Sequence, residues 1–211
     1  MQIKTFVSNP IGENTYVISD GNEAAIIDCG AYSERQWQPI KQYIEENKLN
    51  IRYALQTHTH FDHIYGLHFV ERDFGIKPMF HALDHELYTL ANDSTMAMMG
   101  EPFPYPLPSP CDYLKDSQHI MLGSLCIEVI HTPGHTPGGV CLYIEQESIA
   151  FSGDTLFAGS IGRYDLPGGD FETEISSIRE RLLTLPENTV VYPGHGPCTT
   201  IAREKMGNAY F

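Results

Sequence analysis

The sequence predicts an α/β fold in which stacked β-sheets are flanked by helices. Short apolar runs typical of strands fall into two groups, one in each half of the chain, and segments with helical spacing accompany both groups. Loops bearing histidine or aspartate come directly after apolar runs in both halves. These observations favour stacked sheets with helices outside, although periodicity alone is equally compatible with other mixed layered folds.

The first half opens with strands. Short apolar runs at residues 3–7, 14–18 and 24–28 are separated by turn residues such as Asp20-Gly21-Asn22, which indicates a meander. From residue 33 the apolar side chains, among them Trp37, Ile40 and Ile44, recur near the helical period with polar residues between them. This pattern predicts a helix on the protein surface.

The middle of the chain alternates strands and helices and then becomes irregular. Residues 51–57 predict a buried strand, 63–74 a helix, 78–81 a short strand, and 84–98 a helix with Asp84 at its N-cap. Five prolines within residues 100–110 exclude a regular helix or a central strand, so we expect an extended loop there. This loop is equally compatible with a connector and with a binding flap.

The second half repeats the first in outline. Apolar runs predict strands at residues 120–122, 126–130, 140–144, 148–151 and 189–192, and residues 171–184 predict a helix.

Composition narrows the class of protein. The 211 residues suffice for one domain with a full core, which we expect to span residues 1–211. A net charge of -14 with 13 Lys and Arg disfavours nucleic-acid binding. No signal-peptide pattern or membrane-spanning run is present, so we expect a cytoplasmic protein. The five cysteines, Cys29, Cys111, Cys126, Cys141 and Cys198, have no C-x-x-C spacing and are expected to be free thiols.

A cluster of metal-ligand side chains follows the strand predicted at residues 51–57. His58, His60, Asp62 and His63 lie within six residues, and imidazole with carboxylate suits zinc, iron or manganese. Single candidates lie in later loops rich in glycine: His135 in His-Thr-Pro-Gly-His-Thr-Pro-Gly, Asp154 in Phe-Ser-Gly-Asp-Thr, and His195 in Tyr-Pro-Gly-His-Gly. Four further histidines we assign to ordinary core or surface positions: His68, His81, His85 and His119.

This ordered series of motifs resembles the metallo-β-lactamase-fold hydrolases over nearly the whole chain. The stretch from Gly153 to Gly169 resembles the glyoxalase II-like branch, particularly its short bacterial members. The resemblance implies an αββα sandwich with two mixed sheets and two metal ions at one edge. It assigns His58, His60 and His135 to the first metal, Asp62, His63 and His195 to the second, and Asp154 as the bridge. It also implies that Asp28 orders the site from behind the ligands, with Cys29 where family members commonly have proline.

The expected function is metal-dependent hydrolysis of a small-molecule substrate. Two divalent ions, zinc first and iron or manganese as alternatives, would generate a hydroxide that attacks a thioester carbonyl, with Asp62 and Asp154 as the catalytic carboxylates. A thiolate needs little protonation as it leaves, which ranks thioesters first. A lactonase or esterase uses the same seven ligands. A persulfide dioxygenase would instead hold one iron through His58, His135 and Asp154.

Other activities rank lower. Asp154 disfavours a β-lactamase, since zinc β-lactamases usually carry cysteine or serine in place of the bridging acid. The acidity of the chain disfavours a nuclease. A metal-binding module without turnover is disfavoured by a ligand set that leaves room for a shared water.

Substrate contacts are expected from Arg163 and Tyr164. Arg163 matches the basic residue that follows the bridging-aspartate motif in glyoxalase II, and Tyr164 lies beside the position where that family has tyrosine and this chain has Asp165. The chain also ends at Phe211 without the C-terminal helical extension of that family. This departure argues against S-lactoylglutathione specifically and leaves open a smaller thioester or another low-molecular-weight thiol. Pairing of Arg163 with Asp165 or Asp170 is the alternative interpretation.

Overall fold

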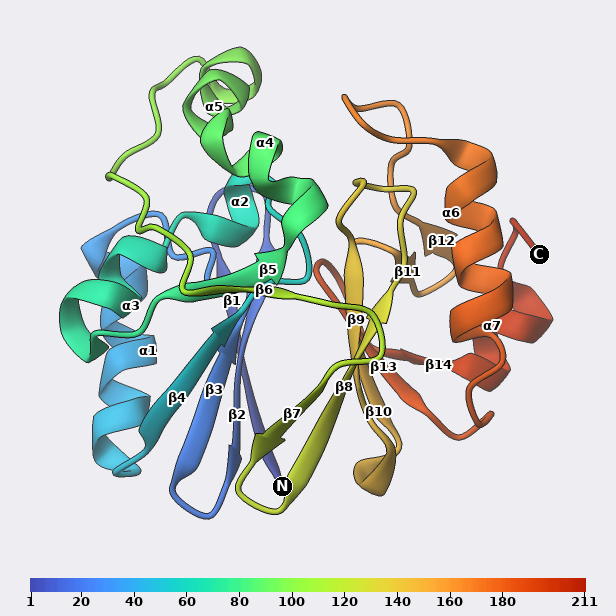
Figure 1. Ribbon diagram of the computed structural model, residues 1–211, viewed down its shortest axis with the longest axis horizontal. Coiled ribbons are helices and arrows are strands. Elements are labelled where there is room, and N and C mark those ends of the chain that lie inside the picture. The colour runs from blue at the N-terminus through green and yellow to red at the C-terminus, as the bar shows by residue number, and fades with distance from the viewer.

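Two six-stranded sheets pack face to face, with helices on their outer faces, in the computed structural model, which describes residues 1–211 (Figure 1). The expected αββα sandwich with two mixed sheets is confirmed. None of the helices is both long and apolar enough to cross a lipid bilayer.

The first sheet has the order β1-β2-β3-β4-β5-β6. β1, β2 and β3 pair antiparallel, and β3, β4, β5 and β6 pair parallel. Its strands are β1 (Gln2–Ser8), β2 (Glu13–Asp20), β3 (Glu23–Ile27), β4 (Asn50–Leu55), β5 (Pro78–His81) and β6 (Asp112–Leu114).

The second sheet has the order β14-β13-β10-β9-β8-β7. β10 and β13 pair parallel, and the other neighbours pair antiparallel. Its strands are β7 (His119–Leu122), β8 (Leu125–His131), β9 (Val140–Ile144), β10 (Ile149–Gly153), β13 (Val190–Pro193) and β14 (Thr199–Thr200), and a separate short hairpin is formed by β11 (Leu156–Phe157) and β12 (Ser160–Ile161).

Alternation along the strands builds the core between the sheets. In β2, Tyr16 and Ile18 face the other sheet, whereas Val17 faces the outer helices. In β9, Leu142 faces the first sheet and Cys141 faces the outer helices of its own sheet. Because side chains alternate across a strand, each sheet buries both faces, and its strands are accordingly apolar on both sides.

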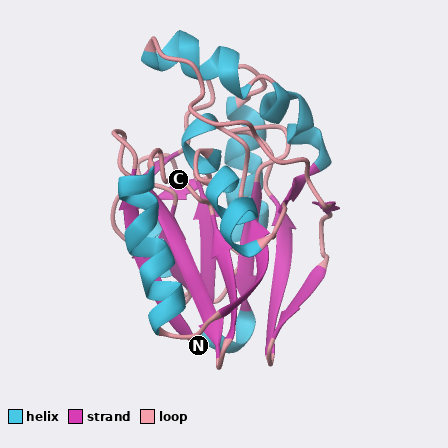
Figure 2. Cartoon of the chain, turned by 90° about the vertical axis from the view of Figure 1, so that its left-hand side faces the viewer, coloured by secondary structure: helices cyan, strands magenta, loops and turns pink.

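The helices form three groups. α1 (Glu34–Glu46) and α3 (Leu67–Phe74) cover the first sheet, and α6 (Phe171–Ser177) and α7 (Ile201–Gly207) cover the second. The short helices lie at one end of the strands, where Figure 2 shows most of the helical turns and loops: α2 (Phe61–Ile64), α4 (His85–Thr89) and α5 (Ala91–Met99).

Several element predictions need correction. The single helix expected at 63–74 is split into α2 and α3, because the amide of Gly66 donates to the carbonyl of Cys29 at 2.7 Å, and a side chain at Gly66 would collide with the Cys29 sulfur. The helix expected at 84–98 is broken at Leu90 into α4 and α5. The helix expected at 171–184 becomes α6 followed by a π-helical turn at Ile178–Leu182.

Other boundaries and some elements were also missed. The strand expected at 51–57 ends at Leu55, so the last residues before the histidine cluster are already loop. β6, β11, β12, β14 and α7 were not predicted, and the four strands among them have three residues or fewer. Residues 100–110 contain no helix or strand, as expected.

Candidate metal centre

The site lies at one edge of the sandwich, where strands of both sheets end. The chain leaves β4 at Leu55 and reaches His58 three residues later, and α2 supplies Asp62 and His63. From the second sheet, His135 follows β8, Asp154 follows β10 directly, and His195 follows β13. Strand ends therefore bring together side chains that lie up to 137 positions apart in the sequence, the separation of His58 and His195.

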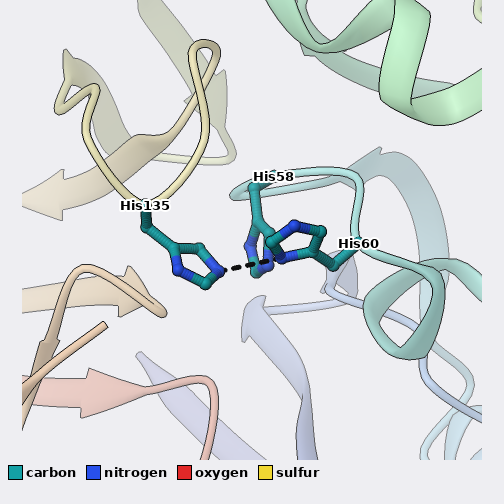
Figure 3. A group of neighbouring side chains, drawn as sticks. All are labelled: His58, His60 and His135. Carbon is teal, nitrogen blue, oxygen red and sulfur yellow. Dashed lines mark hydrogen bonds between the residues drawn. The ribbon is translucent and has the colours of Figure 1, made fainter. Parts of the chain in front are cut away.

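His58, His60 and His135 form the first of two triads. Figure 3 shows their rings converging, with Nδ1 of His60 2.9 Å from Nε2 of His135. One ring nitrogen from each residue lies within 4.8 Å of the other two, a spacing suited to a single ion.

Asp62, His63 and His195 form the second triad. Nε2 of His195 lies 3.1 Å from Oδ2 of Asp62, and Nε2 of His63 lies 3.5 Å from the same oxygen. One ligand atom from each of the three residues again lies within 4.8 Å of the others.

The Asp154 carboxylate lies between the two triads. Its Oδ1 is 3.3 Å from Nε2 of His63, and its Oδ2 is 3.6 Å from Nε2 of His195 and 3.7 Å from Nε2 of His135. The seven side chains that the sequence singles out are thus brought together, with Asp154 in contact distance of both groups.

Several buried polar atoms of the cluster lack a hydrogen-bond partner, which bears on whether the cluster suits metal ions. Nε2 of His58, Nε2 of His63 and Oδ1 of Asp154 are buried without a hydrogen-bond partner. Buried polar atoms are normally paired, so three orphaned atoms on residues of this cluster fit the ligand set of divalent cations. Burial and the neighbouring histidines lower the pKa of His58, which favours the neutral imidazole that binds metal.

Asp28 supports the cluster from behind. Its Oδ1 accepts from the Thr57 amide at 2.7 Å, and its Oδ2 accepts from the Thr57 hydroxyl at 2.6 Å and lies 3.1 Å from Nδ1 of His63. Asp28, His58 and His63 also lie close enough to form a third group. Because both oxygens of Asp28 already have partners, the residue is better placed to orient His63 than to bind an ion.

Cys29 has a packing position. Its side chain is fully buried in the cluster between the first sheet and its helices, and burial raises the pKa of its thiol. It belongs to none of the groups of potential ligands.

Asp84 is a site residue that sequence reasoning assigned only to a helix N-cap. It occupies that position before α4, but its side chain does not cap the helix. Instead the carboxylate accepts from the Thr59 amide at 3.1 Å, the Thr136 hydroxyl at 3.0 Å and the Gly138 amide at 2.6 Å. Burial raises its pKa to about 6, against the opposing effect of these bonds. Asp84 therefore ties the loop of His58 and His60 to the loop of His135.

Glu174 was missed entirely. It lies in α6, is fully buried, and its Oε2 accepts from the backbone amide of His135 at 2.7 Å. Burial raises its pKa to about 8. A glutamate inside a predicted helix carries no local signal of such a role, since only the tertiary fold brings it to His135.

The predicted substrate residues lie at the rim. The Arg163 side chain pairs with Asp165, with Nε–Oδ1 at 3.0 Å and Nη2–Oδ2 at 3.1 Å, which is the pairing that the sequence left open. Its backbone carbonyl lies 2.7 Å from Nδ1 of His135. The ring of Tyr164 packs on Phe171 at 4.8 Å between centroids.

A cavity of about 690 Å³ opens over the cluster. His60, Asp62, His135, Asp154 and His195 all face it, and Arg163 lies on its lining, whereas Tyr164 does not. None of residues 100–110 lines it, which disfavours the interpretation of that loop as an active-site flap. The loop packs instead on the outer helices, and Tyr88 donates a hydrogen bond to the carbonyl of Pro108 at 2.5 Å.

Comparison with known proteins agrees with this geometry. The family model described as the metallo-beta-lactamase superfamily matches residues 8–195. The chain belongs to this superfamily. The expected general class, a metallo-hydrolase, is confirmed. The fold, together with its histidine and aspartate clusters, implies divalent metal ions.

Two curated relatives match along most of their length. The chain is 37% identical to a probable metallo-hydrolase, YqgX, of Bacillus subtilis, covering 95% of this chain and 93% of the relative. It is 34% identical to the hydroxyacylglutathione hydrolase GloC of Haemophilus influenzae, covering 90% and 88%.

Two solved structures are also similar. A structure titled BLEG-1 B3 metallo-beta-lactamase has a TM-score of 0.90 and 36% identity, covering 99% of both chains. TTHA1623 in a di-iron-bound form has a TM-score of 0.87 and 35% identity, covering 100% of both chains.

Proposed function

We propose that this protein is a dinuclear metal hydrolase of the glyoxalase II-like branch that cleaves a small thioester. The observation that supports the proposal best is the position of Asp154, whose carboxylate lies within 3.3–3.7 Å of histidine nitrogens from both triads. A carboxylate shared between two sets of ligands is suited to bridging two ions.

In this proposal each triad holds one ion. His58, His60 and His135 would hold the first, Asp62, His63 and His195 would hold the second, and Asp154 would be shared by both. Zinc is our first choice, with iron or manganese as alternatives because the same ligand types accept all three. The similarity to a protein solved with two irons makes iron the stronger of these two alternatives. When bound, the ions would lower the pKa of a shared water and polarise the substrate carbonyl.

The residues of the chain hold and orient the reacting groups. Burial raises the pKa of Asp62, but His63 and His195 outweigh this effect and lower it overall, so Asp62 is a carboxylate that can orient the water and accept its proton. Asp28 fixes the ring of His63, and Asp84 and Glu174 fix the loops of the histidines. These contacts would keep the ligand side chains in the arrangement that the reaction requires.

The choice of thioesters follows from the leaving group. Apart from the proposed ligands, the cavity lining contains one carboxyl group, that of Asp93, and no cysteine or tyrosine. A thiolate leaves without much protonation, whereas an amine requires a general acid. The resemblance to a hydroxyacylglutathione hydrolase supports the same class of substrate.

Other reactions of the same site are outcomes of the test. A lactonase or esterase would use the same residues. A single-iron persulfide dioxygenase would leave the second triad of Asp62, His63 and His195 without a role. Hydrolysis of β-lactams is a second candidate, since the chain is 36% identical to a structure titled as a metallo-beta-lactamase.

The test combines elemental analysis with substrate comparison. Purified protein is measured for metal content and for hydrolysis of a simple acyl thioester, S-lactoylglutathione, a lactone and a chromogenic cephalosporin, with His58→Ala and Asp154→Ala as comparisons. We expect close to two metals per chain and thioester turnover that falls at least about a hundredfold in both variants. One iron with oxygen consumption, or no metal, would refute the proposal, and a lactone or cephalosporin preference would replace thioesters.

A further inference from the structure

The cavity above the metal centre has a polar floor and two apolar walls. Figure 1 shows α4 and α5 at the same end of the strands as the hairpin of β11 and β12. The floor of the cavity is formed by the histidine and aspartate cluster. The first wall comes from α4, α5 and the loop before β2, and the second from residues 157–167. The two walls belong to opposite halves of the sandwich.

The first wall exposes large apolar side chains. Ile11 is 46% exposed, Leu90 is 43% exposed and Met98 is 53% exposed, and all three line the cavity. Exposed apolar side chains that gather in a concave site mark a surface that is covered when a ligand binds. Methionine adds adaptability, because its unbranched side chain fills irregular gaps.

The second wall is apolar as well. Phe157, Ile161, Leu166 and Pro167 face the cavity from the segment that follows Asp154. A ligand whose reactive carbonyl sits at Asp154 would therefore extend between two hydrocarbon surfaces.

Positive side chains are scarce in this cavity. Arg163 is the single lysine or arginine on the lining, and its guanidinium is already engaged by both oxygens of Asp165. Asp93 adds a negative charge to the wall, and the whole chain has a net charge of -14. A thioester of glutathione carries two carboxylates, which bind well only where cations are free to receive them.

We infer that the cavity binds an uncharged, apolar acyl chain, so that the preferred substrates are aliphatic acyl thioesters of medium length rather than S-lactoylglutathione. This inference rests on the proposed function for the reacting group, and it deepens that function by naming the acyl class. The acyl chain would lie between Leu90 and Met98 on one side and Phe157 and Leu166 on the other.

The test separates binding from turnover. Hydroxamates chelate metal ions through a constant head group, so calorimetric titration of zinc-loaded protein with acetohydroxamate and hexanohydroxamate reports the contribution of the walls alone. We expect the longer compound to bind on the order of tenfold more tightly, since its added methylene groups would be buried. Leu90→Asn and Met98→Gln should each reduce that gain to roughly threefold or less.

Matched controls lie outside the cavity. Leu83→Asn replaces an exposed leucine before α4, and Met206→Gln replaces an exposed methionine of α7, and neither residue lines the cavity. Both should keep the full gain with chain length. Equal affinity for the two hydroxamates, or an equal loss in the control variants, would overturn the inference.

Kinetics complete the test. The acetyl and hexanoyl thioesters of N-acetylcysteamine, an uncharged thiol, are compared with S-lactoylglutathione, and we expect kcat/KM for the hexanoyl compound to exceed the other two by about tenfold. A preference for S-lactoylglutathione would overturn the inference. A gain in hydroxamate affinity without hydrolysis of any thioester would support the apolar cavity and refute the proposed function.

Discussion

The two halves of the molecule supply the metal centre in different ways. The first half contributes four side chains from residues 58–63, all within one loop and the short helix α2. The second half contributes His135, Asp154 and His195, each from a separate loop after a different strand. A compact motif can fix its own ligands locally, whereas dispersed ligands depend on the alignment of whole strands.

The two halves also differ in how their histidines are held in place. In the first half, Asp28 contacts the imidazole of His63 directly. In the second half, His135 is held through the backbone, because Glu174 accepts from its amide and its ring contacts the carbonyl of Arg163. Asp84 links the two halves beside the metal centre, since it accepts from Thr59 on one side and from Thr136 and Gly138 on the other.

The largest effect is expected from Asp84 and depends on pH. Its pKa is raised to about 6 from 3.8, so the folded protein binds this proton more tightly than the unfolded chain does. The contribution of Asp84 to stability is therefore greatest below about pH 4 and declines as the pH rises through 6. Asp84→Asn cannot ionise, so wild type should lose roughly 3 kcal/mol relative to the variant between pH 4 and pH 7.

Urea unfolding of the metal-free proteins at several pH values measures this change. Asp165→Asn is a suitable control. Asp165 lies on an exposed loop, and its hydrogen bond with Arg163 is the main cause of its lowered pKa. A constant difference in stability between wild type and Asp84→Asn across this range would show that Asp84 is ionised in the folded protein throughout, and the two halves would then be joined by a charged link.

The next largest effect is expected for zinc affinity. It compares Asp28, which contacts the ring of His63, with Glu174, which contacts the backbone amide of His135. Asp28→Asn should weaken zinc binding by roughly 10–100-fold, because the carboxylate raises the basicity of the His63 ring and fixes its tautomer. Glu174→Gln retains an oxygen that can accept from the His135 amide, so the loss should be less than about threefold. Competition with a chromophoric chelator measures both affinities. Equal losses would remove the distinction between the two halves.

The smallest effect concerns the contact between the sheets. The buried hydroxyl of Tyr16 in β2 donates to the carbonyl of Pro193 at the end of β13, at 2.6 Å. Tyr16→Phe should lower the free energy of unfolding by about 1 kcal/mol, as measured by urea titration. Tyr65→Phe is the matched control, because the buried hydroxyl of Tyr65 has no hydrogen-bond partner and its removal should be neutral or stabilising. A comparable loss in both variants would mean that the Tyr16 hydrogen bond adds nothing specific.

Elements and motifs whose signals are local could be predicted from the residues alone. Alternating apolar runs predicted most strands of both sheets, and the spacing of Trp37, Ile40 and Ile44 predicted α1. The cluster at residues 58–63 indicated metal binding because four metal-ligand side chains so close together are rare without a metal. His135, Asp154 and His195 became convincing candidates through the resemblance of their loops to a known family, and the fold then placed all three beside the cluster.

Tertiary structure alone decided the rest. The contact between Gly66 and Cys29 broke a helix that periodicity made continuous, and long-range packing turned Asp84 from an expected helix cap into the link between two loops. Glu174 reached His135 only because α6 covers the second sheet. The same holds for the apolar walls of the cavity, whose residues are ordinary in sequence. Local patterns report the period of a segment, whereas the partners of a buried carboxylate depend on which distant segments the fold brings together.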